Sequence, residues 1–244
     1  VTGAGVVDAP NSADVNFANV ERLNAFADTR EASLLVLATT GADQISILRA
    51  DNNALVQTNG STDVHIDGFG SLLVRGRAGD DAIFVDPQNT IEVTVEGNEP
   101  SASDSVTVHV SADTAVTPNG NDSADISMTG RANVFVRTAE SLEIAGDDSN
   151  IELTVNSTAG LVDTIVHTAG SEADSGRVVV NTLLPVDYSS LGWSSIAAGG
   201  SVVISDPSGR LDFLEYIGTS LPDVFTVNSV TGTVDLLTGF TTTH

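Results

Sequence analysis

A short pattern recurs along most of this chain: an aspartate is followed by apolar residues at every second position. In the clearest case, residues 76–85, a turn with two glycines and two aspartates precedes Ile83 and Val85. Alternation with a period of two is typical of a β-strand with one buried face. The pattern returns at intervals of about 21 residues. Its aspartates are Asp43, Asp63, Asp81, Asp104, Asp125 and Asp148.

Each interval holds more than one strand-like segment. Between Asp81 and Asp104, residues 90–95 also alternate, and residues 97–100 have the composition of a turn. A repeat of about 21 residues with two or three short strands is typical of a solenoid, whose stacked coils bury a shared core. We therefore predict an all-β protein, a parallel β-helix with coils of about 21 residues.

An antiparallel β-sandwich is the alternative fold. A sandwich built from hairpins would place a two-residue turn signal between most of its strands. Such signals occur only at Asn59-Gly60, Asp67-Gly68 and Asn119-Gly120.

One domain is predicted for residues 1–244, because no segment has the composition of a linker. Residues 17–30 have apolar residues at helical spacing, with a pair of strands as the alternative. The predicted parts are an N-terminal cap region at 1–32, regular coils at 33–180, an irregular loop at 181–200, and the last coils with a C-terminal cap at 201–244.

The charge of the chain restricts its partners. Asp and Glu total 33 against 9 basic residues, which gives a net charge of −24. A field of this sign repels nucleic acid and anionic membranes and attracts cations. No apolar run is long enough to cross a bilayer, so we expect neither nucleic-acid binding nor membrane insertion.

The absence of cysteine excludes a disulfide framework and a cysteine-based zinc site. The chain begins at Val1, which we interpret as a processed or excised segment. The absence of lysine and cysteine, together with the abundance of Thr, Ser, Asn, Asp and Gly, favours an extracellular or cell-surface location.

Part of the opening stretch matches the motif G-G-x-G-x-D-x-U-x. Gly76, Gly79, Asp81 and Ile83 occupy the first glycine, third glycine, aspartate and apolar positions, while Arg77 replaces the second glycine. The stretch resembles the calcium-binding repeats of secreted bacterial RTX proteins, although the tandem nine-residue repeat is absent. The chain as a whole resembles the degenerate β-solenoid repeats of secreted bacterial surface proteins.

Calcium is the one cofactor that the sequence suggests. It prefers six to eight oxygen ligands, and aspartate-rich turns supply several. The alternative is that these aspartates only close turns by accepting hydrogen bonds from backbone amides. The candidate calcium ligands are Asp43, Asp80, Asp81, Asp147 and Asp148.

Catalytic motifs are lacking in the sequence. There is no G-x-S-x-G elbow and no phosphate-binding loop, and among the nine arginines only Arg75 and Arg77 are close together. The histidines have no ligand spacing, and we predict that they face outward from strands. They are His65, His109, His167 and His244.

These observations favour a non-enzymatic extracellular structural protein, a subunit of a cell-surface layer, fibre or filament. Its predicted partner is itself, or neighbouring surface proteins or glycans. One alternative is a calcium-stabilised adhesin or glycan-binding module. Another is a polysaccharide-degrading β-helix enzyme, which would need a concave face that gathers carboxylates with Trp193, Tyr188 or Arg75.

Overall fold

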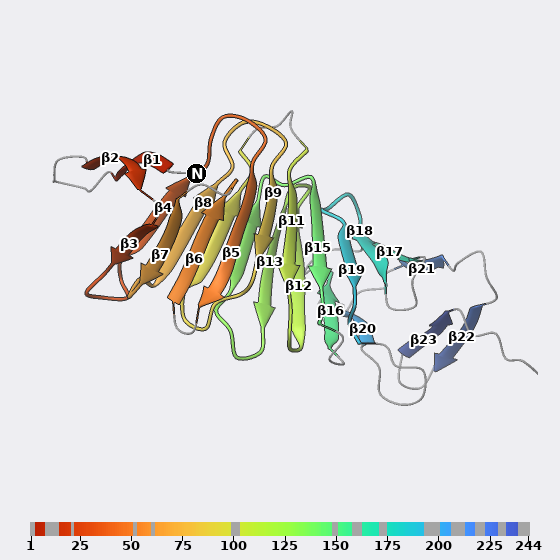
Figure 1. The fold of residues 1–244 in the computed structure, drawn as a ribbon. Coiled ribbons are helices and arrows are strands. Elements are labelled where there is room, and N and C mark those ends of the chain that lie inside the picture. The colour runs from red at the N-terminus through yellow and green to blue at the C-terminus, as the bar shows by residue number, and fades with distance from the viewer. Residues whose placement is uncertain are drawn as a thin grey trace, which may run out of the picture.

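Two large β-sheets form most of this computed structural model (Figure 1), and no helix occurs among the described residues. The prediction of an all-β protein is confirmed. The structure describes residues 3–7, 15–20, 22–50, 53–59, 62–98, 103–147, 151–157, 163–170, 175–192, 201–205, 213–217, 223–228 and 233–238. Within these ranges, no helix is long and apolar enough to cross a membrane.

The larger sheet, called the long sheet here, has eleven strands, and the short sheet has eight. In spatial order, the long sheet contains β21 (Phe213–Ile217), β17 (Thr164–Ala169), β18 (Gly176–Val180), β19 (Val186–Ser189), β15 (Ser141–Ala145), β11 (Ser105–His109), β9 (Ala82–Val85), β5 (Gln44–Ala50), β6 (Asn53–Thr58), β7 (Asp63–Asp67) and β3 (Arg22–Phe26).

The short sheet contains β20 (Ser201–Ser205), β16 (Glu152–Asn156), β12 (Thr114–Gly120), β13 (Ser123–Met128), β14 (Val134–Arg137), β10 (Glu92–Glu96), β8 (Ser71–Arg75) and β4 (Ser33–Leu37). Among the described strands, two hairpins pair only within themselves. They are β1 (Gly3–Val7) with β2 (Val15–Val20), and β22 (Asp223–Asn228) with β23 (Thr233–Thr238).

The chain passes back and forth between the two sheets. From β8 in the short sheet it enters β9 in the long sheet, returns to β10, and enters the long sheet again at β11. Strands β10 and β11 each pair in parallel with the strand that precedes them in the same sheet. Asp81 and Asp104, in equivalent positions before β9 and β11, are 23 residues apart.

Antiparallel meanders interrupt this alternation. Strands β5–β7 and β17–β19 form meanders in the long sheet, and β12–β14 forms one in the short sheet. Each meander adds two strands before the chain changes sheet, so Asp43 and Asp81 are 38 residues apart. Among the described strands, parallel partners about 21 residues apart in sequence occur only in the pairs β8–β10 and β9–β11. Both sheets are mixed rather than purely parallel or antiparallel.

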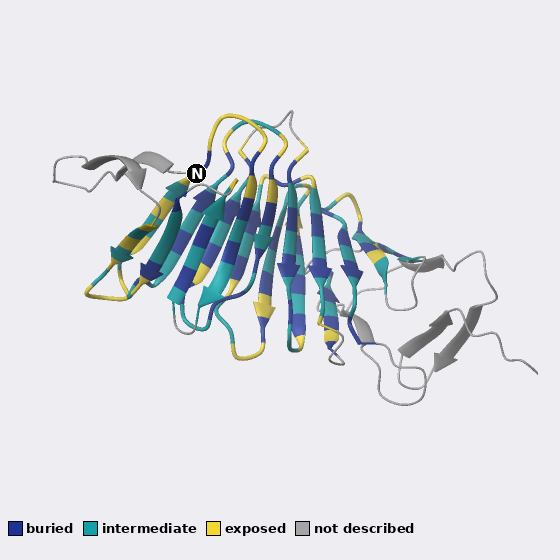
Figure 2. Cartoon of the chain, in the orientation of Figure 1, coloured by how far each residue is buried: buried dark blue, intermediate teal, exposed yellow. Residues whose placement is uncertain are grey.

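The core lies between the sheets, where inward side chains of both contribute to one apolar cluster. Figure 2 shows the resulting alternation of buried and less buried positions along the strands. In-register pairing aligns Ile47, Val85, Val108 and Ile144 in one row across the long sheet, and each is 0% exposed. Burial of each such aliphatic side chain stabilises the fold by roughly 1.5–3 kcal/mol.

Two predicted segments differ from the structure. The helix predicted within residues 17–30 is wrong, because this segment contains β2 and β3 instead. In β3, Leu23 and Ala25 are less exposed than their neighbours and pair in register with β7, so strand pairing overrides the helical spacing. The segment 181–200, predicted as an irregular loop, contains β19, while residues 193–200 lie outside the described residues.

Candidate functional site

Four carboxylates lie in a column where the chain enters the long sheet, and we call them the carboxylate stack. Each is the residue immediately before a strand: Asp43 before β5, Asp81 before β9, Asp104 before β11 and Glu140 before β15. The three aspartates are 2%, 1% and 0% exposed, whereas Glu140 is exposed. Because these strands are parallel neighbours, the residues before them are brought together.

Hydrogen bonds link each member of the stack to the next. The Asp43 amide donates to Asp81 Oδ1 (2.8 Å), and the Asp81 amide donates to Asp104 Oδ1 (2.9 Å). The Asp104 amide in turn donates to Glu140 Oε2 (2.7 Å). At the other end, the Asp43 carboxylate accepts hydrogen bonds from the Thr39 amide (2.7 Å) and hydroxyl. Each buried strand-entry amide therefore has a charged acceptor, which strengthens the bond.

Burial in the stack has an electrostatic cost for Asp81. Burial raises the pKa of Asp81 to about 6, and the charges of Asp104, Asp43 and Asp80 add to this rise; the hydrogen bond from the Asp43 amide opposes it. Its Oδ2 atom is buried and has no hydrogen-bond partner. Ionised Asp81 is thus destabilising in the folded protein, because charge is removed from water without full compensation.

Glycines in the turns leave room for these side chains. A Cβ atom at Gly76 would collide with Asp81 Oδ2, and one at Gly97 would collide with Asp104 Oδ2 and the Thr138 carbonyl oxygen. Gly76, the first glycine of the motif-like stretch, is therefore required for the close approach of a buried carboxylate. Glycine is favoured at position 79 for a different reason, because the backbone there has a φ of 115°, in the left-handed region.

An aspartate–asparagine clasp closes each meander of the long sheet. Asn59, at φ 49°, donates its side-chain amide to Asp43 and accepts a hydrogen bond from the Gln44 amide (2.7 Å). The Asn59 amide donates to the Gln44 carbonyl oxygen (2.9 Å). The same contacts recur with Asn181 (φ 53°), the buried Asp163 and Thr164.

The predicted calcium ligands do not converge on one point. Asp43 and Asp81 belong to the stack and accept backbone amides, whereas Asp80 is exposed and accepts the Ser103 amide (3.1 Å). Asp147 is exposed, and Asp148 lies outside the described residues. Among the described residues, no group of three or more His, Asp or Glu side chains is arranged to hold a metal ion. Calcium at these positions stays a prediction.

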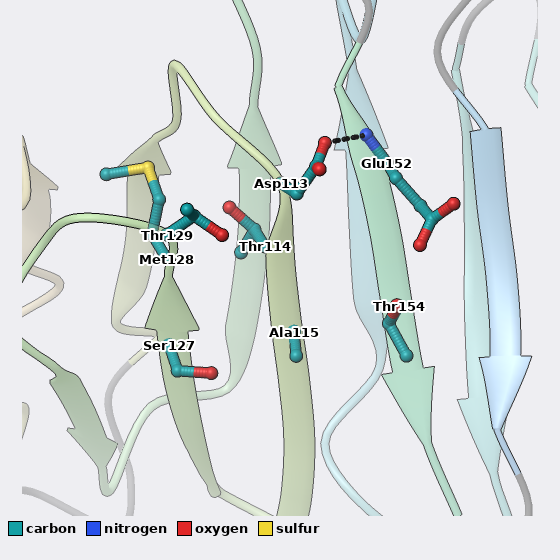
Figure 3. Close-up of a pocket in the computed structure, with 8 residues that line it drawn as sticks. All are labelled: Asp113, Thr114, Ala115, Ser127, Met128, Thr129, Glu152 and Thr154. Carbon is teal, nitrogen blue, oxygen red and sulfur yellow. Dashed lines mark hydrogen bonds between the residues drawn. The ribbon is translucent and has the colours of Figure 1, made fainter.

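A shallow groove of about 350 Å³ lies on the short sheet (Figure 3). Ala115 on β12 lies between Ser127 on β13 and Thr154 on β16, so a small side chain is flanked by two hydroxyls. At one end, Asp113 Oδ1 accepts the Glu152 amide (3.0 Å). The eight lining residues include neither an arginine nor an aromatic ring, the side chains expected in a groove that cleaves acidic polysaccharides.

The residues named for a polysaccharide-degrading face are not gathered together. Arg75 on β8 of the short sheet pairs with Glu96 (2.6 Å). Tyr188 on β19 of the long sheet is buried, with its hydroxyl 2.9 Å from His167 Nε2. Trp193 lies outside the described residues.

The prediction that the histidines face outward is wrong for His167, which is 5% exposed. His167 comes two residues after the buried Ile165 on β17 and therefore faces the same inward side. Gly176 on the intervening strand leaves room for the Tyr188 hydroxyl to reach it. Burial lowers the pKa of His167 to about 4, so the ring is neutral at pH 7. His65 and His109 are half-buried, and His244 lies outside the described residues.

Sequence reasoning found the three aspartates of the stack but missed Glu140, Asp163 and both clasps. Glu140 precedes an alternating segment just as the aspartates do, so its signal was present. The clasps had a weaker signal, an asparagine 16 or 18 residues after the aspartate.

Comparison with known proteins adds no relative: no family model, curated protein or solved structure matches this chain. Its function is therefore inferred from the chain's own geometry.

Proposed function

We propose that this chain is a β-solenoid unit of an extracellular structural assembly, a cell-surface layer, fibre or filament, and that it is not an enzyme. The observation that carries the proposal is the carboxylate stack. Its buried aspartates accept hydrogen bonds from the backbone of the neighbouring strand entry, so these polar side chains hold successive coils together.

The alternation of the chain between two sheets supports the solenoid. Four long-sheet strands, β5, β9, β11 and β15, are parallel neighbours, and each is reached after a visit to the short sheet. The meanders are then insertions into coils of the same winding path. Stacking of this kind makes each coil depend on its neighbours for burial, which suits an extended structural element.

The use of arginine also supports a structural role. Three arginines on the sheets are engaged with nearby carboxylates: Arg75 with Glu96, Arg137 with Asp125 (2.6 Å) and Arg177 with Asp187 (2.6 Å). These pairs connect neighbouring strands and offset part of the charge of −24. They leave those guanidinium groups occupied rather than aimed at an acidic substrate.

Electron microscopy of the purified chain tests the proposal. At high protein concentration, we expect ordered fibres or layers, in either the presence or the absence of calcium. Monomers at every concentration, or cleavage of a polysaccharide by the purified chain, would contradict the proposed role.

A calcium-stabilised adhesin or glycan-binding module is the second proposal. It is supported by the unpartnered Oδ2 of Asp81 and by the hydroxyl-lined groove over Ala115. A ligand that binds only the native state must raise its melting temperature. This proposal predicts a higher Tm when millimolar calcium is added after chelation, and a smaller rise in an Asp81→Asn variant. An unchanged Tm would exclude calcium stabilisation.

A further inference from the structure

The end of the stack formed by β3 and β4 is open. Among the described residues, β3 pairs only with β7 and β4 only with β8, so each strand has one free edge. The core is also uncovered there. Leu34 and Val36 of β4 are half-buried, whereas Leu72 and Val74, beside them on β8, are 1% and 0% exposed.

The large apolar side chains that the described structure exposes lie on these same two strands. Phe26 on β3 is 73% exposed, and Leu35 and Leu37 on β4 are 48% and 53% exposed. Phe26 lies on the outer face of the long sheet, whereas Leu35 and Leu37 lie on the outer face of the short sheet. On β4, exposed apolar side chains coincide with an unpaired backbone edge, which marks an interaction surface. A partner that supplies a strand would satisfy both.

The edge of β4 lacks the features that block strand addition. Natural edge strands are protected by charged residues, proline or a bulge. β4 has the sequence Ser-Leu-Leu-Val-Leu, without charge or proline, and it pairs with β8 without a bulge. In a chain with a net charge of −24, an uncharged edge is where two copies can approach with the least repulsion.

We propose that two copies of this chain associate through β4, which pairs antiparallel with β4 of the second copy around a two-fold axis. This pairing places Leu35 opposite Leu35 of the second copy, and Leu34 opposite Val36, so apolar side chains cover each other. Two-fold dimers are the commonest oligomers, and antiparallel pairs are slightly more stable than parallel ones. The inference rests on the proposed structural role and deepens it, since it names the first contact of the assembly.

The size of the contact sets its strength. The terminal coil spans residues 22–37. This is somewhat less than the roughly 20–30 residues a side of a standard interface. The dimer is therefore weak and concentration-dependent. Added salt strengthens it, because salt screens the repulsion between two acidic copies.

Single cysteines test the pairing, because the native chain has none. In an antiparallel pair, opposed Cβ atoms are about 4.5–5.5 Å apart. We expect Leu35→Cys to form covalent dimers under oxidation or with a short thiol cross-linker, at least about tenfold faster than Leu73→Cys. Leu73 lies beside Leu35 on β8 and provides the matched control.

Several outcomes would overturn the proposal. Equal rates for Leu35→Cys and Leu73→Cys mean random collision. Preferential cross-linking of Leu35→Cys with Ser205→Cys, on the edge strand β20, means head-to-tail stacking instead. A monomeric Leu35→Cys variant whose new thiol resists reagents means that the chain itself covers the edge.

Sedimentation provides a second, independent measurement. We expect Leu35→Lys to weaken self-association by at least about tenfold, and Thr94→Lys, in the same register row on β10, to leave it unchanged. Fibres that persist in Leu35→Lys would overturn this interface but leave the structural role intact. A dimer that forms without any larger assembly would support the interface and contradict that role.

Discussion

Asp81 and His167 are buried groups whose pKa values are shifted in opposite directions. The pKa of Asp81 is raised from 3.8 to about 6, and that of His167 is lowered from 6.5 to about 4. Between these values, the folded protein binds a proton at Asp81 that the unfolded chain lacks, while the unfolded chain binds one at the histidine that the folded protein lacks. The two contributions to the pH dependence of stability therefore have opposite signs and nearly cancel.

Single variants separate the two contributions. Asp81→Asn removes the Asp81 contribution, so its free energy of unfolding relative to the wild type decreases by about 3 kcal/mol as pH falls from 6 to 4. His167→Gln removes the histidine contribution, so its free energy of unfolding relative to the wild type increases by about 3 kcal/mol as pH falls from 6.5 to 4. Urea denaturation across this pH range measures both slopes. Asp147→Asn, an exposed aspartate whose charge does not act on Asp81, is the control. Parallel slopes for the wild type and both variants would contradict the assignment.

Gly76→Ala tests the close approach of Asp81 to the turn. The added methyl group would overlap Asp81 Oδ2, and the nearby Gly97 carbonyl oxygen, 3.2 Å from the new Cβ atom, restricts relaxation. We expect a loss of roughly 1–3 kcal/mol in the free energy of unfolding, as for other overpacked sites. Gly41→Ala is the matched control, because the nearest neighbour of its new Cβ atom would be Thr39 Oγ1 at 3.9 Å. Equal stabilities of the two variants would show that Gly76 is not required.

At the scale of the strand, the sequence predicted strands well where an aspartate precedes alternating apolar residues. β5, β9 and β11 follow Asp43, Asp81 and Asp104, because at each of these entries the aspartate amide donates a hydrogen bond to the carboxylate at the neighbouring entry. The same pattern misled at Asp125, which lies within β13, since the aspartate there faces outward and pairs with Arg137. An aspartate before a strand and one on its outer face look alike in sequence.

The meanders were the least predictable elements. Alternation shows that a segment is a strand but does not show which sheet it joins or whether its neighbour is parallel. Asn59 and Asn119, both followed by glycine, were recognised as turn signals, and both lie beside antiparallel strands of a meander. Two-residue turn signals are few because many neighbouring strands of a sheet are not consecutive in the chain. Between them, the chain passes through the other sheet.

The clasp at Asn181 provides a test at this scale. Asn181→Ala removes a side-chain partner of buried Asp163 and the acceptor for the Thr164 amide. We expect a loss of about 1–3 kcal/mol in stability, the usual effect of removing a hydrogen bond to a charged group. Hydrogen exchange should become faster at the start of β17. Asn98→Ala is the control, since Asn98 is likewise exposed with positive φ (82°), but its side chain donates to the Glu96 carbonyl oxygen rather than to a buried carboxylate. Unchanged exchange at Thr164 would contradict a role for the clasp.

For the whole molecule, periodicity predicted the all-β class, because that class depends only on local alternation. The spacing of parallel neighbours in each sheet depends on the meanders that lie between them in sequence. The carboxylate stack could be predicted only in part, since its burial results from the parallel alignment of strands far apart in sequence. His167 was missed because its burial depends on Gly176 and Tyr188.

The central claim is that stacked strands form the axis of a structural assembly. X-ray diffraction from oriented assemblies measures this directly. Strand spacing and sheet separation give reflections near about 4.8 Å and about 10 Å. We expect the strand-spacing reflection along the long axis of the assembly and the sheet-separation reflection perpendicular to it. A strand-spacing reflection perpendicular to the long axis, or no orientation of either reflection, would contradict the claim.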